Sequence, residues 1–232
     1  MTSVTSTDNT PIRTAADGQH LALPKGRLIF ALDATQSREA TWAIARTVTA
    51  DMFRAAAPVG KLDVKLMHFR GGHESPASCR YSKWVGSGEQ LVQLINKIDC
   101  QSGPTQIGKV LNHALDEIKQ VPVGALVFIG DAMEEDLETL AAQALKLGNA
   151  GCPIYIFHED HRDLTGAPDT RTRNAFKLLA LKSGGEYFEF SPATSRAVDQ
   201  LTEQLGAVAR LAVGDTEALE RIAATALTDQ RG

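Results

Sequence analysis

Short apolar runs alternate with amphipathic patterns along this chain. Runs typical of buried strands occur in the segments RLIFALD, KLDVKLMHF, GALVFIGD, PIYIFHE and EYFEF. Between them, apolar residues recur every three to four positions, as on one face of a helix, in segments that begin near residues 37, 88, 105, 134, 172 and 194. Strands that alternate with helices in this way predict an α/β fold, with a doubly wound, mostly parallel sheet covered by helices on both faces.

Three regions differ in composition. Residues 1–20 contain few apolar side chains and are expected to form a disordered arm, whereas residues 21–212 carry the α/β pattern. Within that domain, SPASCRYSKWVG predicts a hairpin or an edge strand. Residues 213–232 predict a helical tail whose apolar stripe, containing Ala218 and Leu219, could either pack on the domain or dock to a partner.

Charge and cysteine content narrow the function classes. The 232 residues carry a formal net charge of −4 and no basic cluster, which argues against nucleic-acid binding. Cys79, Cys100 and Cys152 lack the spacing of a disulfide framework or a zinc ribbon. We find neither a signal-peptide h-region nor an apolar run of about 20 residues, so a cytoplasmic protein without a membrane anchor is expected.

Oxygen-bearing side chains follow two of the predicted strands. Asp33 ends the first strand and Asp131 follows ALVFIG, so both carboxylates belong to the rim where ligands bind in doubly wound sheets. Thr35 and Ser37 occupy the turn after Asp33, and Thr105 is the predicted N-cap of a helix that starts at the same rim. Carboxylates and hydroxyls are hard ligands, which favours Mg²⁺, Mn²⁺ or Ca²⁺ over zinc or copper.

These motifs resemble the metal-ion-dependent adhesion site (MIDAS) of von Willebrand factor type A (VWA) domains, which have a Rossmann-like fold. The resemblance covers residues 24–212 and implies that Thr35 and Ser37 bind the metal directly. It also implies that Thr105 binds directly or through water, and that Asp33 and Asp131 bind mostly through water. Two departures are Thr35, where Ser is commoner, and Ala132, where Gly is usual; neither removes a ligand atom.

The resemblance also implies a function. VWA domains of this kind bind a protein partner whose Asp or Glu completes the coordination of the metal, and they are not enzymes. Bacterial intracellular relatives work beside ATPases or chaperone systems, so a partner of that kind is expected by analogy.

Two alternatives remain open on the sequence. A metal-assisted phosphohydrolase also places an aspartate after its first strand, but it usually needs a second acid two residues later, where this chain has Thr35. The other alternative is a VWA scaffold with a degenerate metal site that binds through its C-terminal helix.

Four other polar segments receive simpler interpretations. We expect the acids of DAMEEDLE, residues 131–138, to begin a helix and FHEDHRD, residues 157–163, to form a solvated loop. Cys79 lies near His73 and Tyr81, but no base or orienting acid can be placed beside it, so catalysis there is not expected. Residues 86–88, Gly-Ser-Gly, are interpreted as a turn.

Overall fold

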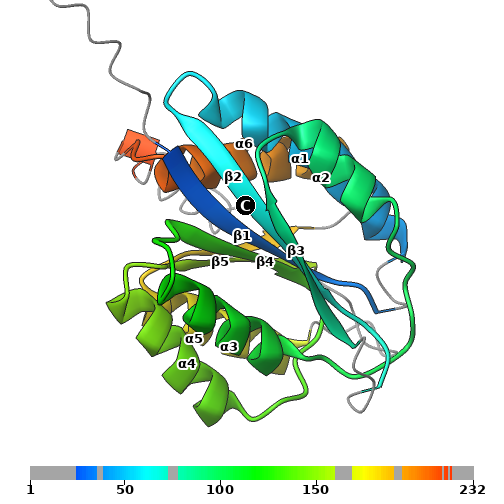
Figure 1. Ribbon diagram of the computed structural model, residues 1–232. Helices are drawn as coiled ribbons and strands as arrows, with labels where there is room; N and C mark the ends of the chain where they lie inside the picture. Colours follow the sequence, from blue (N-terminus) through cyan, green and yellow to red (C-terminus); the bar gives the residue numbers. More distant parts are fainter. Residues whose placement is uncertain are drawn as a thin grey trace, which may run out of the picture.

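A six-stranded sheet with helices on both faces forms the protein (Figure 1). The computed structural model describes residues 25–35, 39–72, 78–159, 169–190, 195–215, 217, 218 and 220. The strands lie in the order β3-β2-β1-β4-β5-β6. Their bounds are β1 (Lys25–Asp33), β2 (Lys61–Phe69), β3 (Cys79–Val85), β4 (Ala125–Gly130), β5 (Ile154–Glu159) and β6 (Tyr187–Phe190).

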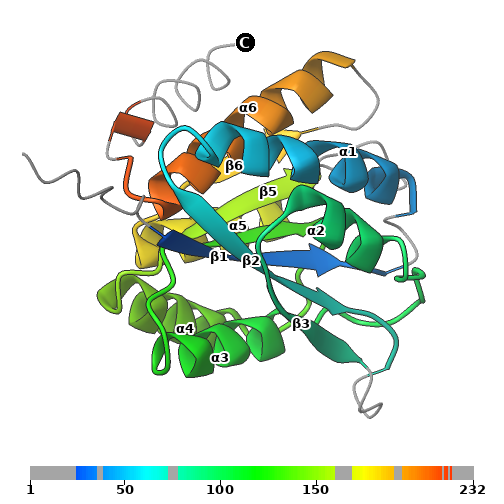
Figure 2. The same cartoon turned by 45° about the horizontal axis from the view of Figure 1, so that its top comes forward.

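The helices form two layers, as predicted from the alternating pattern. In Figure 2, α1 and α6 lie on one side of the sheet, and α3 and α4 lie on the other. The core residues divide in the same way, with α1, α2 and α6 over one face and α3, α4 and α5 over the opposite face. The bounds are α1 (Glu39–Ala56), α2 (Gly88–Ile95), α3 (Ile107–Ile118), α4 (Leu137–Asn149), α5 (Thr170–Ser183) and α6 (Ser195–Ala212).

The central strand β1 is buried on both faces. It pairs in parallel with β2 on one side and with β4 on the other. Side chains alternate along it, so Phe30 enters the core under α1 and α6 while Ile29 enters the core under α3, α4 and α5. Such burial on both faces explains why the strand reads as a continuous apolar run.

Strand β3 is an antiparallel edge strand, which confirms the interpretation of SPASCRYSKWVG. A bulge interrupts its pairing with β2 between Lys65 and Met67. There, the Ser82 hydroxyl accepts the Leu66 N–H at 3.0 Å in place of a backbone carbonyl. Because of the bulge, the two large rings of β3, Tyr81 and Trp84, both lie over the Lys65 ammonium.

The ends of the chain are described only in part. The expected arm, residues 1–20, lies outside the described residues, as does most of the predicted tail helix. Of the tail, Val213 and Ala218 are buried, and Arg210 of α6 forms an ion pair with Asp215 at 2.5 Å. The domain boundaries near residues 20 and 212 stay predictions. Within the described part of the chain, no helix combines the length and apolar character needed to cross a membrane.

Candidate metal centre

Two buried carboxylates mark the point where the sheet reverses its strand order. Asp33 is the last residue of β1, and Asp131 directly follows β4, the neighbouring strand. The chain continues from β1 to β2 on one side of the sheet, whereas β4 and β5 extend it on the other. Only 2% of Asp33 and 7% of Asp131 is exposed. The structure thus confirms that both acids occupy the rim predicted for a ligand.

Thr35 is fixed next to Asp33 by a short turn. Its backbone N–H donates to Asp33 Oδ1 at 2.8 Å, and Thr35 is itself buried. Between them, the Ala34 N–H donates to the Phe69 carbonyl, and the Ala34 carbonyl accepts the Gln101 N–H, each at 3.0 Å. These backbone hydrogen bonds therefore hold the turn to β2 and to the loop that precedes α3, independently of any ligand. Ser37, the third predicted ligand of this segment, lies outside the described residues.

Thr105 is buried in the loop that precedes α3. The next residue, Gln106, is fully buried; its Nε2 donates to the Gly71 carbonyl at 3.1 Å and its Oε1 accepts from Lys109 Nζ at 2.8 Å. The loop also packs so closely on Gly71 that a Cβ on Gly103 would lie 2.2 Å from the Gly71 oxygen. Glycine is required there by this close approach.

Thr105 does not cap α3, contrary to the sequence prediction. The N-cap is Gln106, and its side chain makes no capping hydrogen bond. Instead, the Glu135 carboxylate accepts the first N–H groups of α3, from Ile107 at 2.5 Å and from Gly108 at 2.9 Å. A carboxylate is favoured at this end of a helix because the N–H groups and the helix dipole are positive there. Gly108 permits the contact, since a Cβ would lie 2.9 Å from Glu135 Oε2.

The prediction that the acids after Asp131 begin a helix is correct for Asp136 and Glu138 and wrong for Glu134 and Glu135. Helix α4 starts at Leu137, with Asp136 as its N-cap accepting the Thr139 N–H at 2.8 Å, so only Asp136 and Glu138 serve this helix start. Glu134 and Glu135 precede it and reach across to the loop before α3. Sequence periodicity could not reveal this, because the partners are about 28 residues away in the chain.

Glu134 and Thr105 form a reciprocal pair of hydrogen bonds. The Thr105 N–H donates to Glu134 Oε2 at 3.1 Å, and the Glu134 N–H donates to Thr105 Oγ1 at 3.3 Å. Together with the Glu135 contacts, this pair ties the loop carrying Asp131 to the loop carrying Thr105. Two of the predicted ligands, Thr105 and Asp131, are therefore positioned relative to each other by acids that were predicted only to begin a helix.

A cavity of about 230 Å³ opens between these loops. Its lining contains three predicted ligand residues and the Glu134 side chain, and among the described residues that line it none is basic. The lining residues are Thr35, Ser102, Gly103, Thr105, Asp131, Ala132 and Glu134. The size and oxygen-rich lining fit a hydrated hard cation, which retains several of its waters.

The donor chemistry separates this site from a zinc centre. No three His, Cys, Asp or Glu side chains of the described residues cluster as a metal-binding group. The candidate site instead combines two carboxylates with the hydroxyls of Thr35 and Thr105. Mixed carboxylate, hydroxyl and water ligation is the kind that Mg²⁺ and Mn²⁺ accept. The residues present thus fit the cation that the sequence resemblance implies.

Other predicted polar segments do not join the site. The strand predicted for PIYIFHE is confirmed to its last residue, because His158 and Glu159 are buried in β5, so the solvated loop predicted at residues 157–163 does not begin before residue 160. His158 Nδ1 lies 2.7 Å from the Tyr187 hydroxyl, and residues 160–163 lie outside the described residues. At Cys79, burial raises the thiol pKa to about 11, with opposing effects of Lys109 and Glu135, which disfavours the thiolate needed for catalysis.

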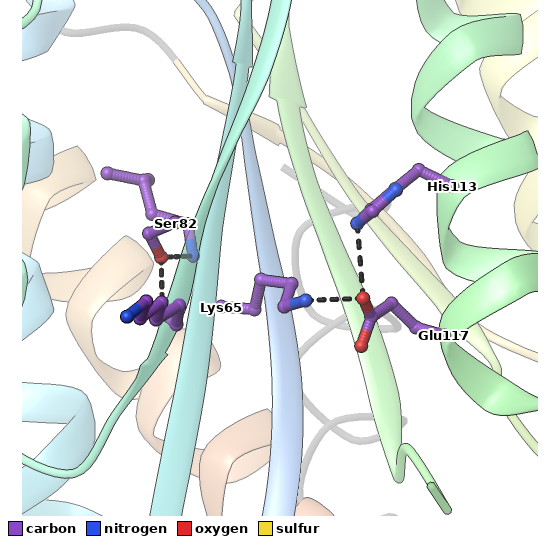
Figure 3. Close-up of polar contacts among 6 residues, drawn as sticks. Lys65, Ser82, His113 and Glu117 are labelled. Atoms are coloured by element: carbon purple, nitrogen blue, oxygen red, sulfur yellow. Dashed lines mark hydrogen bonds and ion pairs between the residues drawn. The ribbon is translucent and has the colours of Figure 1, made fainter. Parts of the chain in front are cut away.

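A second polar cluster lies beside α3, and we call it the Lys65 cluster. It contains Lys65, Tyr81, Trp84, His113 and Glu117. The Lys65 ammonium forms a buried ion pair with the Glu117 carboxylate, and His113 Nε2 lies 3.4 Å from the same oxygen (Figure 3). The Tyr81 ring stacks on His113 with centroids 3.7 Å apart. The ammonium also lies 5.4 Å and 5.2 Å from the ring centroids of Tyr81 and Trp84, so the Glu117 carboxylate and these two rings stabilise its charge.

Solved structures similar to this chain include VWA domains. A von Willebrand factor type A protein from Catenulispora acidiphila superposes with a TM-score of 0.61 at 12% identity, covering 80% of this chain and 43% of that one. The vWF domain of the type V pili tip protein Mfa5 from Porphyromonas gingivalis gives 0.57 at 12% identity, covering 80% and 96%. BatB from Bacteroides thetaiotaomicron gives 0.55 at 17% identity, covering 80% and 99%.

These similarities establish the fold. The chain has the fold of a VWA domain, with the six-stranded sheet and two helical layers described above. It spans less than half the length of the Catenulispora protein and 31% of the pilus adhesin SpaC from Lactobacillus rhamnosus GG, another similar structure. Comparison with protein-family models and with curated protein sequences gives no match.

Proposed function

We propose that this protein is a divalent-cation-dependent protein-binding module. A Mg²⁺ or Mn²⁺ ion would be held at the rim of the sheet by the hydroxyls of Thr35, Ser37 and Thr105 and by the carboxylates of Asp33 and Asp131, with water completing the shell. The cation would supply an electrophilic position that an oxygen ligand from another protein can fill.

The observation that carries the proposal is the cavity at the reversal point of the sheet. The described lining of this cavity places the Thr35 and Thr105 residues beside Asp131, with the buried Asp33 at the end of the neighbouring strand, so oxygen ligands gather at one open volume. A divalent cation would compensate both charges at once. Ligand sites of doubly wound sheets occur at this place for the same topological reason.

Charge balance indicates the kind of group that the partner offers. Asp33 and Asp131 carry two formal negative charges, which neutralise a divalent cation. A neutral centre can still accept one anionic oxygen ligand without a large repulsive cost. We therefore propose that the partner contributes an Asp or Glu side chain, as the resemblance to the adhesion site implies.

The similar structures support protein binding in general and not a particular partner. SpaC is described as a pilus adhesin and Mfa5 as a pilus tip protein, and neither description is that of an enzyme. An ATPase or chaperone system as partner, and a cytoplasmic location, stay predictions for this chain. A phosphohydrolase gains no support from the geometry, because Thr35 is fixed where such an enzyme would need its acid.

Calorimetric titration of the EDTA-stripped protein with Mn²⁺ tests the metal site. We expect one site per chain in the wild type and at least tenfold weaker binding in Asp33→Asn and in Asp131→Asn. The matched control is Asp116→Asn, because Asp116 is an exposed acid of α3 that pairs only with Lys119 among the contacts described. Ser37→Ala tests the ligand that lies outside the described residues.

Equal Mn²⁺ affinity in all of these variants would contradict the proposed site. Loss of binding in Asp116→Asn as well would show that general surface charge, and not this cavity, attracts the ion. The expected pattern is loss confined to the rim residues.

A further inference from the structure

Glu134 places a carboxylate of the protein itself at the proposed binding cavity. Glu134 lines the cavity together with Thr35, Thr105 and Asp131, and its carboxylate contacts Thr105. The residue is exposed, whereas Asp33 and Asp131 are buried. A group that enters the cavity therefore shares it with Glu134.

The contacts of Glu134 are those of a bound carboxylate. Glu134 Oε2 accepts the Thr105 N–H at 3.1 Å, and Thr105 Oγ1 in turn accepts the Glu134 N–H at 3.3 Å. Both the backbone donor and the hydroxyl of this predicted ligand residue are thus engaged by one residue of the neighbouring loop. An acidic side chain from a partner would need the same space and would meet a like charge there.

The neighbouring Glu135 keeps this arrangement in place. Its carboxylate accepts the Ile107 and Gly108 N–H groups at the start of α3. These contacts connect the residue after Glu134 to the residues that follow Thr105. The Glu134 side chain can consequently leave Thr105 without separating the two loops. Glu135 thus holds the loop to α3, while Glu134 lies at the open cavity. A displaceable internal ligand requires this arrangement, because the loop stays in place when the ligand leaves.

We propose that Glu134 is a built-in competitor of the partner's carboxylate. It blocks the cavity through its contact with Thr105, and an acidic partner binds only by displacing it. The inference rests on the proposed function and adds regulation of the same site: the domain is inhibited by its own loop, so isolated acids bind more weakly than they would without Glu134, and a partner with further contacts is favoured.

Acetate binding to the Mn²⁺-loaded protein tests this inference. Acetate that coordinates Mn²⁺ displaces bound water and lowers the water-proton relaxation rate, which gives a readout at the metal. We expect the acetate concentration for half the effect to be roughly tenfold lower in Glu134→Gln than in wild type, because the competing charge is removed while the side-chain shape is kept. Glu134→Ala should behave in the same way. Glu138→Gln is the matched control, since Glu138 belongs to the first turn of α4 and is not among the lining residues.

The outcomes separate this inference from the proposed function. Equal acetate midpoints in wild type, Glu134→Gln and Glu134→Ala, with Mn²⁺ bound in all three, would overturn the inference and leave the metal site standing. Mn²⁺ binding that Asp33→Asn does not weaken would overturn both. An equal gain in Glu138→Gln would show that the effect is general surface charge, which also contradicts a role for Glu134.

Discussion

The Lys65 cluster and the cavity near Asp33 are both buried polar regions that contact α3, yet they are built differently. In the Lys65 cluster a buried ammonium meets a buried carboxylate, a histidine and two aromatic rings, all from this chain. At the cavity, carboxylates and hydroxyls converge on open volume of about 230 Å³ lined by no basic side chain of the described residues. The first region is complete by itself, and the second has room for a cation.

This difference shows how a structural polar cluster can be told from a binding site. Buried charge alone is no guide, because both regions have it. The useful distinction is whether opposite charge and packing fill the region or whether space remains between groups of like character. By this criterion Lys65 holds β2 and α3 together, while Asp131 lines a cavity with room for a ligand.

Removing one member of the Lys65 ion pair should have the largest effect. Glu117→Ala leaves the Lys65 ammonium buried without its carboxylate, which should lower the free energy of unfolding by about 3 kcal/mol. Urea denaturation followed by circular dichroism measures this. The double variant Lys65→Met with Glu117→Leu should recover most of the loss, since apolar side chains of similar volume can replace a buried pair. A double variant as unstable as the single one would contradict a purely structural role.

Acid should lower the free energy of unfolding through two histidines, His68 of β2 and His113 of α3. Burial, followed by the charges of Arg70 and Arg80, lowers the pKa of His68 from 6.5 to about 4, and burial and Lys65 lower the pKa of His113 in the Lys65 cluster. The unfolded chain therefore takes up protons first as the pH falls below 6.5, and stability declines toward pH 4.

For His68 alone this amounts to about 2 kcal/mol between pH 7 and pH 5. Urea denaturation across this range should show the decline in wild type and a smaller one in His68→Gln. An unchanged slope in His68→Gln would mean that His68 is protonated as readily in the folded protein as in the unfolded chain.

The contact of Glu135 with the start of α3 should have a smaller effect. Glu135→Ala removes the acceptor for the first N–H groups of α3 and should cost about 1 kcal/mol of stability, the usual value for a lost helix cap. It should also weaken Mn²⁺ binding, because the loops that carry Thr105 and Asp131 lose a connection. Glu138→Ala, at the start of α4, is the control for stability and for metal binding. Equal Mn²⁺ affinity in wild type and Glu135→Ala would show that the metal site does not depend on the contact between Glu135 and the start of α3.

The strands and helices could be predicted because their signals are local. Periodicity located β1, β4 and the helices to within a few residues, and it placed Asp33 and Asp131 at one rim because parallel strands share an end. The edge position of β3 followed from its polar composition and flanking glycines. Each of these inferences needs only neighbours along the chain and the topology of a parallel sheet.

The contacts between loops could not be predicted in this way. Thr105 looked like a helix cap because it precedes an apolar pattern, but the cap comes from Glu135 in a distant loop. His158 and Glu159 fell within both the predicted strand and the predicted solvated loop, and only the pairing of β5 with β4 and β6 shows that the strand includes them. Lys65 gave no signal, since its counter-charge, Glu117, follows 52 residues later.

The most direct test of the account is the change in thermal midpoint when Mg²⁺ is added to the EDTA-stripped protein. At about a hundred times its dissociation constant, a ligand of the folded state adds roughly 2.7 kcal/mol, which moves the midpoint by several degrees. We predict that wild type and Lys65→Met with Glu117→Leu both show this rise and that Asp33→Asn does not. A rise of equal size in Asp33→Asn, or none in wild type at millimolar Mg²⁺, would contradict a cation site in the cavity.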